Sequence, residues 1–142
     1  MLYRNIYFWV HMEHEHKKHS KFLLMDHVIF VCKYRKKVLE PIDIELKQTI
    51  HDIEKESDFE ILEMETDKDH IHFLIKSQPK VSVVAIVRKL KQETTNRLWK
   101  SQGKYLKRFY WGEKTLWSDG YFASTIGDVS KEAAAMYIRN QG

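Results

Sequence analysis

Two strand-like segments joined by a polar turn constrain the fold of this chain more than any other feature. Phe59–Thr66 partly alternates apolar and charged residues, and His70–Ser77 contains a run of apolar residues. Residues 67–69, Asp-Lys-Asp, are the kind of polar residues that form a turn. An antiparallel hairpin is therefore predicted near the middle of the chain.

The segment before this hairpin predicts a strand followed by a helix. Residues 25–33 are rich in β-branched and aromatic residues, which is typical of a buried strand. Pro41 stands where a first-turn proline would, and residues 43–56 predict a covering helix. The apolar positions that recur at helical spacing are Ile42, Leu46, Ile50 and Ile53.

The segment after the hairpin repeats the helix–strand alternation. A helical stripe follows Ser82 and consists of Val83, Ile86, Val87, Leu90 and Leu98, with Arg88, Gln92 and Thr95 on the opposite side. A turn-rich basic and aromatic stretch is predicted over 103–120, and a last strand over 121–126. Gly127 would break that strand, and Ser130 would cap a short final helix over 131–141.

This order of elements predicts an α+β fold. We expect an antiparallel sheet with a split βαβ core of the ferredoxin-like or RRM-like kind, helices on one face, and an additional C-terminal helix. A chain of 142 residues is the size of one domain, which we place at 21–142. Residues 1–20 include a polar, histidine-rich run and are expected to form a peripheral arm.

Charge and cysteine content narrow the functional classes. Lys plus Arg outnumber Asp plus Glu by 24 to 20, and this modest excess permits a polyanionic partner. The single cysteine, Cys32, excludes an internal disulfide framework and a cysteine-based zinc finger, and it fits a reducing compartment. The apolar run at 6–10 is too short to cross a membrane, which takes about 20 residues. We expect a cytosolic protein with no membrane partner, and Cys32 in its core.

His70 and His72 are the most informative residues. Side chains two positions apart on a strand point to the same face, so the two imidazoles would project together while Ile71 faces the other layer. Such a pair can bind a metal, since imidazole suits Zn, Mn, Fe or Ni. The alternative is two surface histidines on a half-exposed strand. His14 and His16 have the same spacing without a strand context and are expected to be solvated.

Tyr137 and Gln141 form a second candidate group. They are four residues apart in the predicted final helix and would share one helix face. A tyrosine hydroxyl is a poor nucleophile until a metal or base favours its phenolate, and a neighbouring carboxamide oxygen could serve as a metal ligand. The alternative is an aromatic anchor that packs the helix onto the sheet.

A third pattern lies between residues 88 and 111, where cations are interleaved with aromatic rings. Cations for phosphates and rings for base stacking are what binding to a single-stranded or hairpin nucleic acid requires. The alternative is a solvated helix face followed by a basic loop. The residues predicted to make the phosphate contacts are Arg88, Lys89, Lys91, Arg97, Lys100, Lys104, Lys107 and Arg108.

His27 and His51 have no assigned role and are expected to be surface or packing residues.

Taken together, these groups resemble a known family. A strand His-hydrophobic-His followed by Tyr-Ile-x-Asn-Gln in a C-terminal helix resembles the single-tyrosine HUH transposases, the TnpA-like enzymes of bacterial and archaeal IS200-like insertion sequences. The stretches 69–75, 83–98 and 116–127 are also similar to that family. The likeness covers about residues 22–142.

The resemblance implies a transposase that acts on single-stranded DNA with hairpin ends, in the prokaryotic cytoplasm. His70, His72 and Gln141 would hold Mg2+ or Mn2+ against the scissile phosphate, and Tyr137, on the C-terminal helix, would be the catalytic nucleophile. Its attack would give a 5′-phosphotyrosine and a free 3′-hydroxyl, so that strands can be rejoined without ATP. The resemblance also implies a homodimer in which each final helix completes the active site of the partner.

Two other functions stay open at this point. One is a related HUH nuclease that acts in replication or in the processing of palindromic repeats. The other is a non-catalytic nucleic-acid-binding module of the RRM type. That module would present aromatic rings on the central strands as a stacking platform.

Overall fold

The computed structural model describes residues 25–126. The elements, in chain order, are strand β1 (Met25–Val31), 3-10 helices η1 (Lys33–Arg35) and η2 (Glu40–Ile42), helix α2 (Asp43–Lys55), strands β2 (Phe59–Thr66) and β3 (His70–Ser77), helix α3 (Val83–Leu106) and strand β4 (Phe122–Thr125). The predicted order of strands and helices is confirmed over this range. The arm at 1–20 and the predicted final helix lie outside the described residues.

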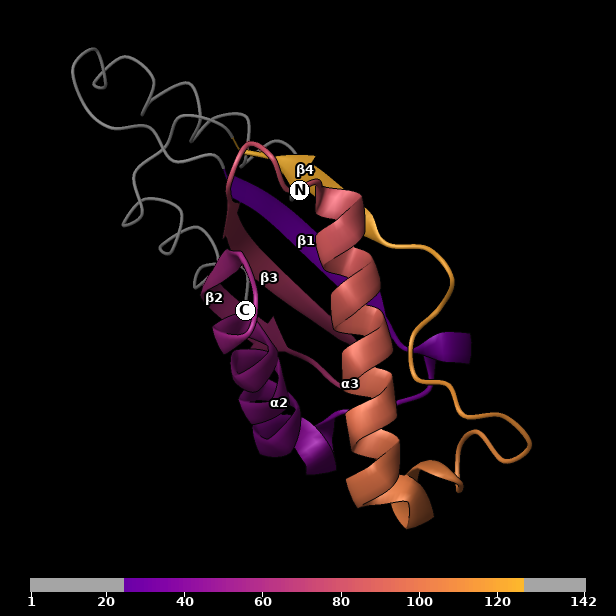
Figure 1. The fold of residues 1–142 in the computed structure, drawn as a ribbon. Coiled ribbons are helices and arrows are strands. Elements are labelled where there is room, and N and C mark those ends of the chain that lie inside the picture. The colour runs from indigo at the N-terminus through magenta and orange to yellow at the C-terminus, as the bar shows by residue number, and fades with distance from the viewer. Residues whose placement is uncertain (1–24, 127–142) are drawn as a thin grey trace, which may run out of the picture.

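The strands form one antiparallel sheet in the order β2-β3-β1-β4. Because β1 and β2 are both antiparallel to β3, they run parallel to each other with β3 between them, and α2 connects them. This is the predicted split βαβ arrangement. Both α2 and α3 cover the same face of the sheet (Figure 1). None of the described helices is long and apolar enough to cross a membrane.

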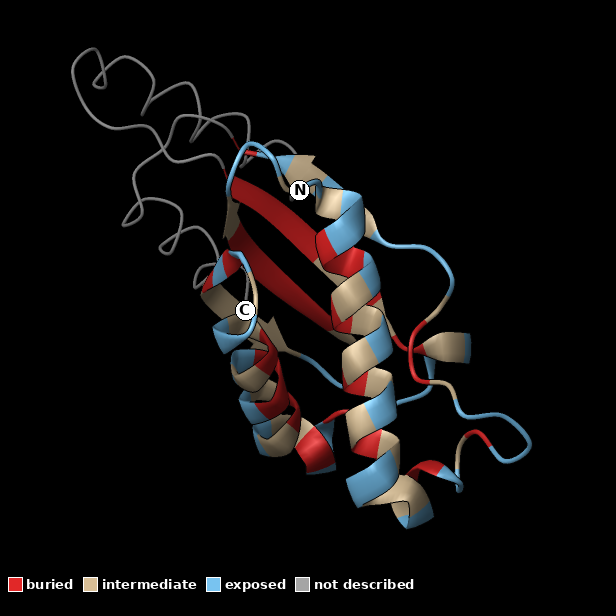
Figure 2. Cartoon of the chain, viewed as in Figure 1, coloured by how far each residue is buried: buried red, intermediate tan, exposed pale blue. Residues whose placement is uncertain are grey.

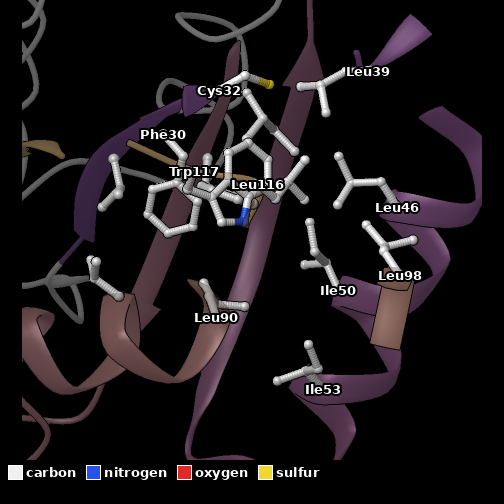
Figure 3. Packing of buried hydrophobic residues seen from close by; sticks show 14 of the residues in the cluster. Phe30, Cys32, Leu39, Leu46, Ile50, Ile53, Leu90, Leu98, Leu116 and Trp117 are labelled. Carbon is white, nitrogen blue, oxygen red and sulfur yellow. The ribbon is translucent and has the colours of Figure 1, made fainter. Parts of the chain in front are cut away.

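The hydrophobic core lies between that face and the two helices (Figure 2). Phe30 of β1 stacks edge-on against Phe73 of β3 and against Trp117, with ring centroids 5.1 and 5.4 Å apart. Figure 3 shows the buried cluster, in which β1 contributes Phe30, α2 contributes Leu46, Ile50 and Ile53, and α3 contributes Leu90 and Leu98. Cys32, the residue after β1, belongs to the same cluster. The helical stripes recognised in the sequence are therefore the buried faces of α2 and α3.

Helix α3 is longer than its stripe predicts. The Ser82 hydroxyl caps it by accepting a hydrogen bond of 3.1 Å from the Ala85 amide. At the other end, residues 103–106 are helical, which corrects the turn-rich stretch predicted over 103–120. The extension passes a distortion at Gln102 and is anchored by the buried side chain of Leu106 and by Tyr105, whose hydroxyl donates to the Val38 carbonyl at 2.6 Å.

Candidate metal-binding and DNA-binding site

His70 and His72 lie side by side on the face of the sheet opposite α2 and α3. Their ring centroids are 6.1 Å apart and the ring planes differ by 32°. Ile71 and Phe73 alternate with them and point into the core. The two imidazoles thus share one face, as the strand pattern predicted. His70 is half-buried, whereas His72 is 9% exposed.

The carboxylate of Asp69 orients His70. Nδ1 of His70 lies 2.9 Å from Oδ1 of Asp69, and the other carboxylate oxygen accepts from the Arg35 guanidinium at 3.3 Å. The hydrogen bond with His70, aided by the charge of Arg35, lowers the pKa of Asp69 below its usual value. An ionised Asp69 accepts the Nδ1 proton, which leaves the lone pair of His70 on Nε2.

A third histidine, His27 of β1, contacts His72 from the same face. Its Nε2 lies 3.4 Å from Nδ1 of His72, and the two rings meet edge-on with centroids 5.6 Å apart. No role was predicted for His27, because the register between two paired strands cannot be predicted from the sequence of one strand. The alternation in β1 could have placed His27 on this face. The pairing of β1 with β3, which sets His27 opposite Leu74 and next to His72, is what brings the two rings together.

Burial favours the neutral form of these two imidazoles. It lowers the pKa of His27 to about 4, with a further contribution from neighbouring His72. Burial, followed by the proximity of His70, also lowers the pKa of His72. A neutral imidazole is the form that binds a metal ion, so the lowered pKa of His72 favours that form.

The two imidazoles fit a divalent metal ion as two of its ligands. His70 and His72 both engage Nδ1 within the protein, and among the described residues neither Nε2 has a hydrogen-bond partner. Residues 25–126 contain no group of three or more His, Cys, Asp or Glu side chains able to hold a metal. A metal bound by the two imidazoles would need further ligands from outside residues 25–126. The predicted ligand Gln141 and the predicted nucleophile Tyr137 both lie outside the described residues.

The basic residues predicted to bind DNA separate into two sets. Lys91 is engaged within the fold: its ammonium donates to the carbonyls of Ser118, Asp119 and Gly120 at 2.7, 3.2 and 2.6 Å. Arg97 is held by Glu56 and Glu93, both at 3.0 Å. Lys89, partly exposed, reaches the Glu56 carbonyl at 3.4 Å. The exposed set consists of Arg88, Lys100, Lys104, Lys107 and Arg108.

The outer side of α3 is hollowed where it adjoins residues 112–119. One hollow of about 400 Å³ is lined by Arg88, Gln92, Asn96 and Lys114, among others. A second, of about 270 Å³, shares Asn96 and Lys114 with it and adds Lys100. A third, of about 250 Å³, continues past Trp99 to Lys107. We call this series of adjoining hollows the α3 groove. Its cations and its aromatic ring suit a nucleic-acid strand.

The chain matches known transposases over most of its length. The family model described as "Transposase IS200 like" matches residues 20–141. The ISDra2 transposase TnpA of Deinococcus radiodurans is 31% identical over 117 residues, which cover 81% of each protein. The transposase for insertion sequence element IS200 of Salmonella typhimurium is 28% identical over 127 residues, covering 87% of this chain and 80% of that protein.

Solved structures agree with this match. A Deinococcus radiodurans R1 protein, crystallised as a candidate transposase, has a TM-score of 0.67 at 28% identity, over 87% of this chain and 95% of that one. The REP-associated tyrosine transposase bound to a REP hairpin has a TM-score of 0.58 at 14% identity, over 85% of this chain and 66% of that one, and shares the fold. With its sheet, its paired histidines and these matches, the chain belongs to the family of IS200-like transposases.

Proposed function

We propose that this transposase cuts and rejoins single-stranded DNA through a covalent bond to Tyr137. The observation that carries the proposal is the pair of imidazoles on β3, each with Nδ1 engaged by a neighbouring side chain and Nε2 left for a metal. Family membership supports a DNA-processing enzyme. Attack of the Tyr137 oxygen on phosphorus would break the bond to the 3′ oxygen and leave a 5′-phosphotyrosine and a 3′-hydroxyl.

The residues proposed to hold the divalent ion, Mg2+ or Mn2+, are His70, His72 and Gln141. When bound, the ion would polarise the phosphoryl oxygens and offset charge in the transition state. Asp69 and His27 fix the two rings before any metal arrives. Because the rings are held in advance, less conformational freedom is lost when the phosphate and the ion enter.

The proposed substrate is the single-stranded DNA of a mobile element with hairpin ends. Support comes from a structural neighbour that is bound to a REP hairpin and from the exposed cations along the α3 groove. We further propose a homodimer that shares its active sites in trans and works at DNA in the prokaryotic cytoplasm. A short final helix is easily exchanged between protomers.

An RRM-type binding module is disfavoured by the sheet itself. In that module, aromatic rings on the central strands form a stacking platform for bases. Here Phe30 and Phe73 of the central strands β1 and β3 point into the core. The opposite face of these strands carries His27, His70 and His72 instead, which is the chemistry of a metal site.

A covalent-adduct assay tests the proposed function. A hairpin oligonucleotide with single-stranded flanks is labelled at its 3′ end and incubated with the protein and Mn2+. We expect label that migrates with the denatured protein and disappears with EDTA or in Tyr137→Phe. Tyr121→Phe is the matched control, since it removes the hydroxyl of a different tyrosine, which is exposed, and it should form the adduct normally. An adduct that persists in Tyr137→Phe would assign the nucleophile elsewhere.

A further inference from the structure

The α3 groove ends in a larger hollow beside η1. This hollow, of about 520 Å³, is lined by residues from the turn after β1 and by the segment that follows α3. It shares Tyr110, Gly112 and Glu113 with the last hollow of the α3 groove, so the two hollows adjoin. Its lining also includes Tyr34, Lys36 and Trp111. We call it the η1 pocket.

Two aromatic side chains of the η1 pocket are presented to solvent. Trp111 is 81% exposed and Tyr34 is 67% exposed, which makes them the two most exposed aromatic residues among those the structure describes. Large rings are usually covered, since each carries a large apolar area. Two exposed rings at the end of a basic groove are typical of a ligand-binding surface.

The backbone that presents Tyr34 is strained. Tyr34 and Arg35 have φ angles of 60° and 53°, in the left-handed region that side chains other than glycine rarely adopt. Three contacts hold the turn: Lys33 donates its amide to the Leu116 carbonyl at 2.8 Å, Tyr110 donates its hydroxyl to the Lys33 carbonyl at 3.0 Å, and Tyr34 donates to Glu113 at 3.1 Å. Strain maintained by surrounding contacts is a feature of ligand sites.

The charges around the η1 pocket suit a nucleic-acid strand. Lys36 lines the pocket, and Lys107 and Lys114 line the hollow next to it. The acid in the lining, Glu113, is offset by Lys33, whose ammonium lies 3.8 Å away. These lysines can bind phosphates, whereas the rest of the pocket lining consists of aromatic side chains, one glycine and one carboxylate. That part of the lining suits a base better than a phosphate.

We propose that the η1 pocket receives one unpaired base of the single-stranded DNA, stacked on Trp111 and Tyr34, with its flanking phosphates on the nearby lysines. This inference rests on the proposed single-stranded DNA substrate and adds a specific binding site to it. A single turn connects the pocket to the face of the sheet that carries His70 and His72. Tyr34 presents its ring to the pocket while the next residue, Arg35, contacts the Asp69 that orients His70.

The test is a base-deletion scan crossed with variants of the pocket. A hairpin oligonucleotide with single-stranded flanks carries one abasic site at each flank position in turn, and its affinity is measured by fluorescence anisotropy in EDTA. For the wild type we expect one position at which base loss weakens binding about tenfold, in line with base–aromatic stacking. In Trp111→Ala, loss of the base at that position should no longer change the affinity. Trp111→Phe and Tyr34→Phe keep a ring and should retain most of the penalty.

The matched control is Ile44→Ala, which removes an 85% exposed apolar side chain from α2 and should behave as the wild type in the scan. The proposed base-binding role of the pocket is overturned by either of two results. One is a loss of affinity at the abasic position that is as large in Trp111→Ala as in the wild type, and the other is a scan in which no abasic site weakens binding. The wild type could show the abasic penalty, lose it in Trp111→Ala, and yet form no covalent adduct. That result overturns the proposed function and leaves the pocket supported. A wild type that does not bind single-stranded DNA overturns both.

Discussion

Asp69 and His70, neighbours in the chain, form a hydrogen bond of 2.9 Å between the carboxylate Oδ1 and the imidazole Nδ1. Arg35 holds the other carboxylate oxygen at 3.3 Å, so the carboxylate is fixed from both sides. Side-chain partners of this kind set the tautomer and the orientation of a metal-binding histidine. The proposed metal site therefore depends on Asp69 as well as on the two histidines.

The first prediction concerns this carboxylate. Asp69→Ala should lower Mn2+ affinity about 10- to 100-fold, because His70 loses the partner that aligns its ring. Asp69→Asn keeps an acceptor oxygen and should lose less. Mn2+ binding is followed by electron paramagnetic resonance, without any need for turnover. Asp58→Asn, at an exposed position away from the histidines, is the control, and equal affinity in Asp69→Ala and the wild type would show that the bond is not needed.

A second prediction tests His27 as the support of His72. His27→Phe fills the buried space with a ring but removes the nitrogen that faces Nδ1 of His72. We expect a folded protein whose Mn2+ affinity falls about tenfold. His27→Gln, which retains polar atoms, should recover part of that affinity. Thermal unfolding checks the fold of both variants. A folded His27→Phe protein with normal Mn2+ binding would make His27 a packing residue.

The third prediction separates a structural lysine from one that binds DNA. Lys91→Met removes the ammonium that joins three carbonyls of residues 118–120, and should reduce the free energy of unfolding by about 1–2 kcal/mol. Lys100→Met changes an exposed position on α3. It should leave stability unchanged while weakening DNA binding and its dependence on salt. Urea unfolding and salt titrations of binding measure the two effects. Equal stability of the two variants would refute the structural role of Lys91.

A fourth prediction uses Cys32. Burial, reinforced by the charge of Asp69, raises the pKa of its thiol to about 12 from an ordinary 9.0. The folded protein should therefore resist iodoacetamide at pH 8, and urea should expose the thiol to rapid alkylation. Since the unfolded thiol ionises first, its contribution to stability is present below pH 9 and is lost as the pH rises toward 12. Fast alkylation of the folded chain, measured by mass spectrometry, would contradict this.

The fifth prediction addresses the proposed exchange of final helices between protomers. A chain carrying His70→Ala and His72→Ala is mixed with a Tyr137→Phe chain, and adduct formation is measured. With sites shared in trans, a heterodimer has one site with both defects and one intact site, so activity returns. With sites in cis, each site keeps a defect and the mixture stays inactive. Each variant assayed alone provides the baseline.

Much of this fold follows from local patterns. The apolar spacing of Leu46, Ile50 and Ile53 identifies the buried face of α2, because a helix returns to the same side every 3.6 residues. The hairpin of β2 and β3, and the common face of His70 and His72, follow in the same way from the two-residue repeat of a strand. These features depend on residues close together in the chain, so the pattern of the chain was enough to predict them.

Other features required contacts between distant segments. Residues 103–106 continue α3 because Tyr105 reaches Val38 and Leu106 is buried, although a local reading favours turns. Lys91 belongs to a cluster of carbonyls that lie 27 to 29 residues further along the chain. In both cases the partner is distant in sequence, and its position depends on how the elements pack.

The sequence by itself determined the order of the elements, the buried faces of the helices and the pairing of His70 with His72. Only the tertiary structure decided that His27 joins them, that Asp69 is held by Arg35, and that Tyr34 and Trp111 end one groove. The physical reason is the range of the interactions. Periodicity acts within one element, whereas strand register and turn geometry bring together side chains that no local pattern relates.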